Sequence, residues 1–244
     1  CLYFEYQLEC YFGFEVLNKL SDELRLFVLS SVVFECFDSA LCEQVLDIDN
    51  CAQILEKVAM QELFLMPVPE QAGWYRYHPL LQSFLLNRLK SEHSQAYIES
   101  LYRKSAEYFL DKGQLAPAIE YASQANDLGF YALTLEVACH LWLKSGDFEP
   151  VIDALLELND SELEQHAKLL VPLIYALSFT RRFNQAHYYF NKPGLSEASS
   201  EFDFKKVINT LKEHGWLQSQ KGENTIQVKQ NGRNSRYYVI TPQI

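Results

Sequence analysis

The apolar residues of the first sixty positions recur mainly at helical spacing. The first such stretch extends from Glu15 to Val33. Ser21–Asp22 is a helix-start signal within it and divides it into two predicted helices. Shorter stretches with the same period predict helices over 41–45 and 52–60. This part of the chain is therefore predicted to be a group of short helices.

After the fourth helix the pattern changes from a helical period to alternation. Leu63–Val68 and Trp74–Tyr77 are apolar or aromatic segments on either side of a turn that contains Gly73, which predicts a β-hairpin. His78–Pro79 then begins a helix over 80–89, because proline is tolerated in the first turn of a helix. Short helices followed by a hairpin favour a winged helix.

A repeat follows from about Tyr97 to Phe190. Its turns lie at Gly113, Gly146 and Arg181, which are 33 and 35 residues apart, and each turn separates two helical segments. A proline stands four residues after each of the two glycines, in the first turn of the following helix. This period is typical of tetratricopeptide-like helical hairpins, which stack into a superhelix and leave a concave surface for a ligand.

The last forty residues have a different pattern. A segment rich in Pro, Gly and Ser precedes them and is interpreted as a linker. The elements expected beyond it are a helix over 204–214, strands over 216–217, 226–228 and 237–240, and a hairpin turn at Asn231–Gly232. Helix, strand and hairpin form the second half of a winged helix.

The predicted fold class is mainly α, with four parts in order. The parts are a winged-helix domain over 1–95, tetratricopeptide-like helical repeats forming a superhelix over 96–192, a linker over 193–202 and a small winged-helix-like α+β module over 203–244.

The charge is distributed unevenly along the chain, and its net value is −11. Residues 201–244 hold seven Lys or Arg against four Asp or Glu, a net +3, which leaves −14 for residues 1–200. The six cysteines have no regular spacing and are expected to be reduced thiols. No apolar segment is long enough to cross a bilayer, so we expect a cytoplasmic protein without membrane contact. Because the first residue is Cys1, we expect the chain to be a fragment of a longer protein.

The sequence lacks the short motifs of common enzymes. It contains no G-x-x-x-x-G-K-[ST] phosphate loop, no HExxH, no GxSxG and no CxxC pair, and its histidines do not cluster at metal-ligand spacing. We therefore expect that the chain is not an enzyme and has no catalytic residue, no metal site and no cofactor of its own.

One segment carries a resemblance to a known family. The run WYRYHPLLQSFL over Trp74–Leu85 is similar to a signature of the winged-helix domain in MalT-like, ATP-dependent transcriptional regulators of the LuxR type. Further similar segments occur in the same order at Glu15–Leu17, Leu24–Ser31, Leu63–Leu65, Ala106–Tyr108, Gly113 and Ala118–Ile119. The resemblance covers roughly residues 10–190.

The resemblance implies that the histidine at the position of His78 points at the phosphates of bound ADP in this family. Arg76 is a second candidate contact to the phosphates. The alternatives are that His78 caps its helix or packs under the hairpin, and that Arg76 is a charge on the strand surface. ATP or ADP is implied for the full-length family member, whose nucleotide-binding domain would be the partner of the winged helix.

The resemblance also implies that the repeats receive a small-molecule inducer or a regulatory protein in their groove. Aromatic residues at helical spacing are candidates for lining it, with packing in the core as the alternative. These residues are Tyr108, Tyr121, Trp142, Tyr175, Tyr188 and Tyr189.

The tail departs from the family, because the LuxR-type helix-turn-helix is missing. Residues 203–244 instead resemble the small winged-helix modules that end primase-helicase proteins of phages and plasmids. Basic residues of this module are candidate contacts to a DNA backbone, with a solvated hairpin as the alternative. They are Lys205, Lys206, Lys212, Lys221, Lys229, Arg233 and Arg236.

Two functions follow as hypotheses. In the first, the chain is a fragment of a signal-responsive bacterial transcriptional regulator, in which the repeats sense a ligand or partner and couple it to a nucleotide-switch domain outside the chain. In the alternative, it is a DNA-binding protein of mobile-element type that acts through its C-terminal winged helix.

Overall fold

The fold was analysed in a computed structural model, which describes residues 17–60, 65–69, 71–190, 192, 225–230 and 233–238. The chain divides into two compact units, Cys1–Thr134 and Leu135–Ile244. Helices dominate the described residues of both units, so the mainly α class predicted from the sequence is confirmed. The first unit contains the predicted winged helix together with the first helical hairpin of the repeats.

Short helices form the first part of this unit. They are η2 (Leu17–Lys19), α2 (Asp22–Ser31), α3 (Ser39–Leu46), α4 (Cys51–Met60) and the longer α5 (Pro79–Glu92). Side-chain oxygens fix two of the helix starts, because the Ser21 hydroxyl accepts the Leu24 N–H and the Asp38 carboxylate accepts the Leu41 N–H at 2.8 Å. The helix start predicted at Ser21–Asp22 is thus confirmed.

The predicted hairpin is also present. Strands β1 (Leu65–Pro67) and β2 (Tyr75–Tyr77) pair antiparallel, with Leu65 opposite Tyr77. Phe37, from the loop between α2 and α3, extends this pairing, because its N–H and C=O both bond to the backbone of Tyr75 at 2.8 Å. The result is the small sheet of a winged helix. Leu63 and Phe64, which the prediction included in the first strand, lie outside the described residues.

The core of the winged helix lies between α2, α3, α5 and the hairpin. Its largest fully buried side chains include Phe27, Phe34 and Phe37 together with Leu81 and Leu85 of α5. Tyr77 packs into the same core, with its ring 5.2 Å from that of Phe37. This packing places β2 directly before α5, so that the hairpin and the start of α5 form one corner.

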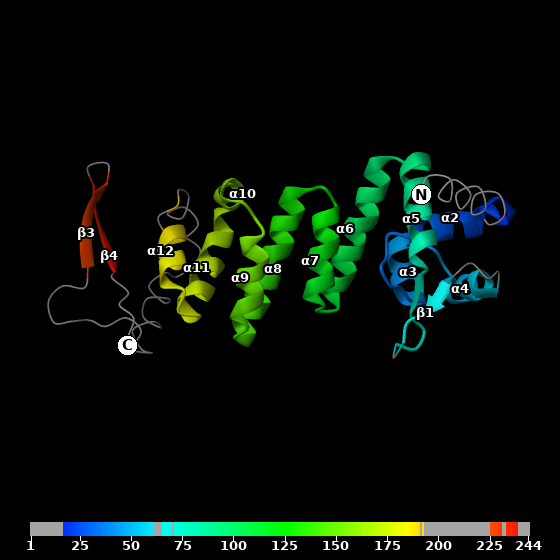
Figure 1. The fold of residues 1–244 in the computed structure, drawn as a ribbon, viewed down its shortest axis with the longest axis horizontal. Coiled ribbons are helices and arrows are strands. Elements are labelled where there is room, and N and C mark those ends of the chain that lie inside the picture. Colours follow the sequence, from blue (N-terminus) through cyan, green and yellow to red (C-terminus); the bar gives the residue numbers. More distant parts are fainter. Residues whose placement is uncertain are drawn as a thin grey trace. The chain divides into compact units, whose positions relative to one another are not determined.

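Helical hairpins make up residues 95–190, in blue-green to yellow in Figure 1. In the first unit, α6 (Gln95–Asp111) and α7 (Leu115–Gln124) pack side by side, and α8 (Leu128–Ser145) begins there. The second unit contains the rest of α8 and then α9 (Phe148–Leu156), α10 (Asp160–Gln165), η3 (Ala167–Leu169), α11 (Leu170–Phe179) and α12 (Phe183–Phe190).

The turns predicted from the 33 to 35-residue period share one backbone geometry. Gly113, Gly146 and Arg181 all have positive φ, at 70°, 81° and 62°. In each turn this residue donates its N–H to the carbonyl three residues before it. The next residue donates to the carbonyl five residues before it, at 2.8 Å in all three turns. This pair of bonds is the Schellman motif, which ends a helix in the left-handed conformation.

The tail is described in part. Strands β3 (Thr225–Gln230) and β4 (Arg233–Tyr238) pair antiparallel on either side of the predicted turn, as the red hairpin in Figure 1 shows. The linker over 193–202, the helix over 204–214 and the strand over 216–217 lie outside the described residues. Within the described part of the chain, no helix combines the length and the hydrophobicity that a membrane span requires.

Candidate functional site

The corner between β2 and α5 holds the two residues singled out as phosphate contacts. Arg76 is exposed in the middle of β2, opposite Met66. His78 is half-buried and is the N-cap of α5, where its Nδ1 accepts the Leu80 N–H at 3.3 Å. Because His78 has extended backbone angles, its side chain and that of Arg76 leave the strand on the same side.

A buried hydrogen bond anchors this corner from below. The Tyr77 hydroxyl, in a side chain that is 2% exposed, lies 2.7 Å from the hydroxyl of Ser31 at the end of α2. Burial raises the pKa of the Tyr77 phenol above its usual value of 10.0, with a smaller opposing effect of the bond to Ser31. The phenol therefore stays neutral and fixes β2 against α2.

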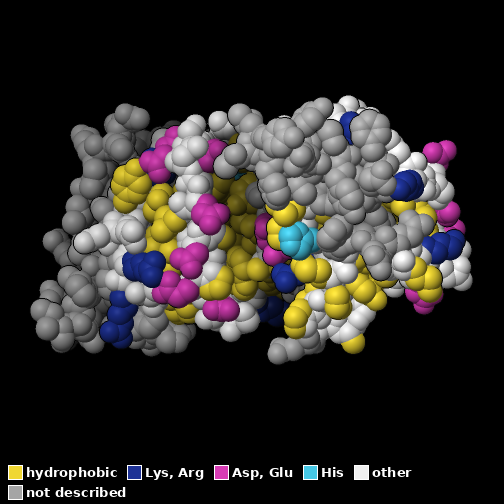
Figure 2. All heavy atoms as spheres, turned by 45° about the vertical axis from the view of Figure 1, so that its right-hand side comes forward, with side chains coloured by type: hydrophobic (Ala, Val, Ile, Leu, Met, Phe, Trp, Pro, Cys, Tyr) yellow, Lys and Arg dark blue, Asp and Glu magenta, His cyan; other side chains and the backbone are white. Residues whose placement is uncertain are grey.

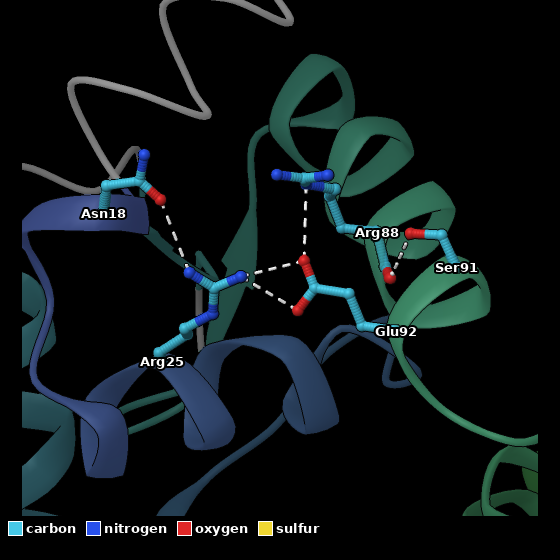
Figure 3. A network of polar contacts seen from close by, with 5 residues as sticks. All are labelled: Asn18, Arg25, Arg88, Ser91 and Glu92. Carbon is cyan, nitrogen blue, oxygen red and sulfur yellow. Dashed lines mark hydrogen bonds and ion pairs between the residues drawn. The ribbon is translucent and has the colours of Figure 1, made fainter.

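Ion pairs brace the opposite end of α5, as Figure 3 shows. The Arg25 guanidinium donates to both carboxylate oxygens of Glu92 at 2.8 and 2.9 Å and to the Asn18 side chain at 3.4 Å. Arg88 Nε lies 3.5 Å from the same carboxylate, and the Ser91 hydroxyl donates to the Arg88 carbonyl. This network joins α2 to α5, the two helices that carry the corner.

The winged helix is also bonded to the first helical hairpin. The Glu35 N–H, in the loop after α2, donates to the Tyr121 hydroxyl of α7 at 3.1 Å. Ser30 of α2 and Tyr97 of α6 share a hydroxyl–hydroxyl bond of 2.8 Å. Lys104 of α6 forms an ion pair with Asp47, the residue after α3. We refer to this boundary as the seam. It is formed by α2, the residues directly after α2 and α3, and the helices α6 and α7.

A cleft of about 320 Å³ opens beside the seam. Its winged-helix wall includes Glu35, Gln71 and Trp74. The opposite wall belongs to the helical hairpin of α6 and α7, is called the hairpin wall below, and includes Gln114, Glu120 and Tyr121. The winged-helix wall comes from the loop after α2 and from the tip of the β-hairpin, whereas the hairpin wall comes from α7 and the turn before it. Aromatic, amide and carboxylate groups from two parts of the fold therefore face one small cavity.

The aromatic residues of the repeats divide between packing and exposure. Tyr108 and Tyr121 are buried in the core, Trp142, Tyr175 and Tyr189 are half-buried, and Tyr188 is 53% exposed. On the face shown in Figure 2, apolar and acidic side chains alternate over the repeats. Core packing thus accounts for two of the six aromatic candidates for lining the groove.

The described cysteines are free thiols, as expected, and burial is the largest cause that raises their pKa values. The pKa rises to about 11 for Cys51 and to about 12 for Cys139, and it is raised as well for Cys36 and Cys42. A thiol whose pKa is raised holds its proton at neutral pH and is a poor nucleophile. Within the described residues no His, Cys, Asp and Glu side chains gather into a metal site.

Most of the candidate DNA contacts lie outside the described residues. Lys205, Lys206, Lys212 and Lys221 belong to this group. The backbone places Lys229 near the end of β3 and Arg233 and Arg236 on β4, opposite Gln230 and Gln227. Their DNA contacts stay a prediction.

Comparison with known protein families gives one match to the first unit. The model of the MalT winged helix domain matches residues 14–97, which include the corner, α5 and the winged-helix side of the seam. Residues 14–97 are thus similar to the MalT winged helix domain. The resemblance stated from the sequence is therefore confirmed for this domain.

Two curated relatives extend the likeness to MalT beyond this domain. The HTH-type transcriptional regulator MalT of Vibrio cholerae is 25% identical over 201 residues, which is 82% of this chain and 22% of the relative. The protein of the same name from Cronobacter sakazakii is 34% identical over 113 residues, which is 46% of this chain and 12% of the relative. The chain is thus MalT-like and spans less than a quarter of the length of these regulators.

Sequence reasoning placed the corner of the MalT winged helix domain and missed the cleft. Glu35 and Glu120 are 85 residues apart and read as ordinary charges of a loop and a helix surface. Trp74 was noted as part of the predicted hairpin and of the family signature, and not as a cleft residue. A usable signal was Tyr121 in the second half of α7, since a buried phenol needs a partner for its hydroxyl.

Proposed function

We propose that the chain couples signal sensing to a nucleotide switch in a MalT-like transcriptional regulator. In this proposal the helical repeats respond to a small-molecule inducer or a regulatory protein, and the winged helix passes the response to a nucleotide-binding domain. The observation that carries the proposal is the seam, because three polar contacts join the winged helix to the first repeat hairpin within one compact unit.

The seam supports coupling for a physical reason. Two sites influence each other only through an element whose arrangement both of them bias. The bond between Glu35 and Tyr121 and that between Ser30 and Tyr97 tie α2 and its following loop to α6 and α7. A shift of the first hairpin therefore has to move α2 or break these bonds. Through the buried bond between Tyr77 and Ser31, a movement of α2 reaches the corner.

The corner supports contact with nucleotide phosphates. Arg76 and His78 are two residues apart on extended backbone, which puts both side chains on the same side, and guanidinium and imidazole groups can both donate to phosphate oxygens. His78 and Arg76 would then hold ADP of the nucleotide-binding domain in the resting state. ATP or ADP is the cofactor proposed for the full-length protein.

The phosphate contact is tested in the full-length protein with His78→Asn. Asparagine retains the N-cap bond to the helix but is too short to replace Nε2, so it separates capping from phosphate contact. We expect release of bound ADP to accelerate about tenfold, which corresponds to one lost charge-assisted bond. Ser94→Asn, the same substitution class at the N-cap of α6, is the control and should release ADP at the native rate. Native ADP release in His78→Asn contradicts the phosphate contact.

The coupling is tested without knowledge of the inducer, because linkage is reciprocal. Replacing ADP by ATP in the full-length protein should change amide hydrogen exchange in α6 and α7, and Tyr121→Phe should weaken that change. Tyr102→Phe removes a hydroxyl from the neighbouring stacked ring and is the matched control. Identical exchange of α6 and α7 with the two nucleotides would sink the coupling proposal.

A second candidate function is DNA binding by residues 203–244. The paired strands β3 and β4 favour it, because a two-stranded wing with basic residues is a common contact to a phosphate backbone. Gel-shift titration of the whole chain should show binding at low salt that falls as salt rises. Replacing Lys229, Arg233 and Arg236 by Gln should reduce the salt slope, and replacing Lys57, Lys90 and Lys112 should not. No shift at low salt excludes this candidate.

A further inference from the structure

We propose that the cleft beside the seam binds a guanidinium group, from a free small ligand or from the arginine side chain of a partner. The site goes beyond the proposed function, because it requires neither the nucleotide-binding domain nor the corner. Its position between the winged helix and the first hairpin means that a bound ligand would contact both walls at once.

The size of the cleft restricts the ligand. Its volume of about 320 Å³ lies at the low end of the range of ligand pockets, which is roughly 300–1,000 Å³. A cavity of this size suits one side-chain-sized group.

The charge of the cleft selects a cation. Glu35 stands on the winged-helix wall and Glu120 on the hairpin wall, and both are exposed. Burial is the largest cause that raises the pKa of Tyr121. The bond from the Glu35 N–H lowers this pKa, and the charges of Glu120 and Glu35 raise it further. Both carboxylates therefore act on the phenol of Tyr121, which lines the same cleft. A cation placed there would meet negative potential from both sides.

The shape of the lining favours a planar cation over an ammonium. Trp74 is a half-buried aromatic wall of the cleft, whereas the rings of Tyr121 and Phe109 are buried and stack on each other with an interplanar angle of 1°. Trp74 is therefore the lining ring that a planar cation would stack on. A guanidinium stacks on aromatic rings and binds carboxylates in a fork of parallel bonds. Gln71 and Gln114 also line the cleft, and their amide oxygens are acceptors for further guanidinium donors.

The positively charged side chain of Arg76 should compete with such a ligand. Burial and Glu35 raise the pKa of Cys36, another residue of the winged-helix wall, whereas Arg76 lowers it. The positive field of Arg76 thus reaches one side of the cleft. Removal of this charge should strengthen binding of a guanidinium, whereas removal of a carboxylate should weaken it.

The experiment titrates the whole 244-residue chain with acetyl-arginine methylamide and follows the indole N–H signal of Trp74 by NMR, assigned with Trp74→Phe. We expect a saturable shift with a Kd of roughly a millimolar, weaker at higher salt. Acetyl-citrulline methylamide has the same shape without the charge and should give no saturable shift. Absence of a shift with the arginine probe, or an equal shift with citrulline, overturns the proposal.

Variants test the assignment of the two carboxylates. Glu35→Gln and Glu120→Gln should each weaken binding about threefold, and Arg76→Gln should strengthen it about twofold, as expected for exposed charges. Glu107→Gln removes an exposed charge of α6 outside the cleft lining and is the matched control. An equal effect of Glu107→Gln, or no effect of the two cleft variants, overturns the proposal.

A peptide arm distinguishes the two sources of the guanidinium. If a partner protein supplies it, the peptide Gly-Ala-Arg-Ala-Gly should bind about tenfold more tightly than the single residue, because flanking backbone adds contacts. Equal affinities indicate a free small ligand, and both outcomes retain the site. Failure of this titration leaves the tests of ADP release and hydrogen exchange unaffected, since they use the full-length protein and measure its response to nucleotides.

Discussion

At the scale of single residues, hydrogen bonds of buried tyrosine hydroxyls connect parts of the chain that are distant in sequence. Ser31 and Tyr77 are 46 residues apart, and Glu35 and Tyr121 are 86 apart. Alternation predicted that Tyr77 belongs to a strand, but no local pattern names the partner of its hydroxyl. Such partners are fixed by tertiary packing, so they could not be read from the sequence.

Replacement of Tyr77 tests this anchor through its pH dependence. The folded pKa of Tyr77 is raised, so its stabilising effect is fully present below the unfolded value of 10.0 and is lost as pH rises above it. In urea unfolding, Tyr77→Phe should lose about 1 kcal/mol at neutral pH and should show a shallower loss of stability above pH 10 than the native chain.

Ser31→Ala is the matched control for this prediction. It breaks the same hydrogen bond but retains the buried phenol, so it should lose stability at neutral pH and still show the steep alkaline loss. If Tyr77→Phe keeps the native alkaline slope, another buried group determines the alkaline unfolding.

At the scale of elements, the sequence predicted the helical hairpins well because their signals are local. The spacing of Gly113, Gly146 and Arg181 located three turns, and all three have the left-handed geometry that ends a helix. The strand-like pairing of Phe37 with Tyr75 was not predicted. It involves one residue in a loop, which has no alternation to reveal it.

Opposite substitutions in two of these turns should have opposite effects. Gly146→Ala should lower the free energy of unfolding by about 1 kcal/mol, because a Cβ at positive φ is strained even though no atom lies within 4 Å of it. Arg181→Gly should raise it by about 0.5 kcal/mol, since the released strain exceeds the added entropy of the unfolded chain. Urea unfolding of both variants measures the effects. A loss of stability in Arg181→Gly would mean that its side chain contributes more than its backbone costs.

At the scale of the whole molecule, charge was predictable in amount but not in arrangement. The net charge is −11, whereas the structure places Glu35 and Glu120 around one cleft and bonds one guanidinium nitrogen of Arg25 to both carboxylate oxygens of Glu92. The candidate corner at Arg76 and His78 could be located in advance because it carries a family signature. The cleft could not, because its two walls come from separate segments.

The net charge predicts a salt response of the entire chain. Raising the NaCl concentration from about 0.05 to about 0.5 M should increase the urea midpoint, because screening reduces repulsion among the excess carboxylates. A variant with Glu107→Gln, Asp153→Asn and Glu157→Gln, three exposed positions, should respond less. An unchanged response in this variant would show that repulsion does not cause the effect.

The seam also decides where the chain can be divided for expression. A fragment that ends at residue 97, where the family match ends, would retain Glu35 but lose Tyr121, Phe109 and the rest of the hairpin wall. Its newly exposed aromatic surface should make it prone to aggregate. A fragment that continues through Gln124, the end of α7, keeps these contacts. It is the shortest fragment that we expect to stay monomeric and folded.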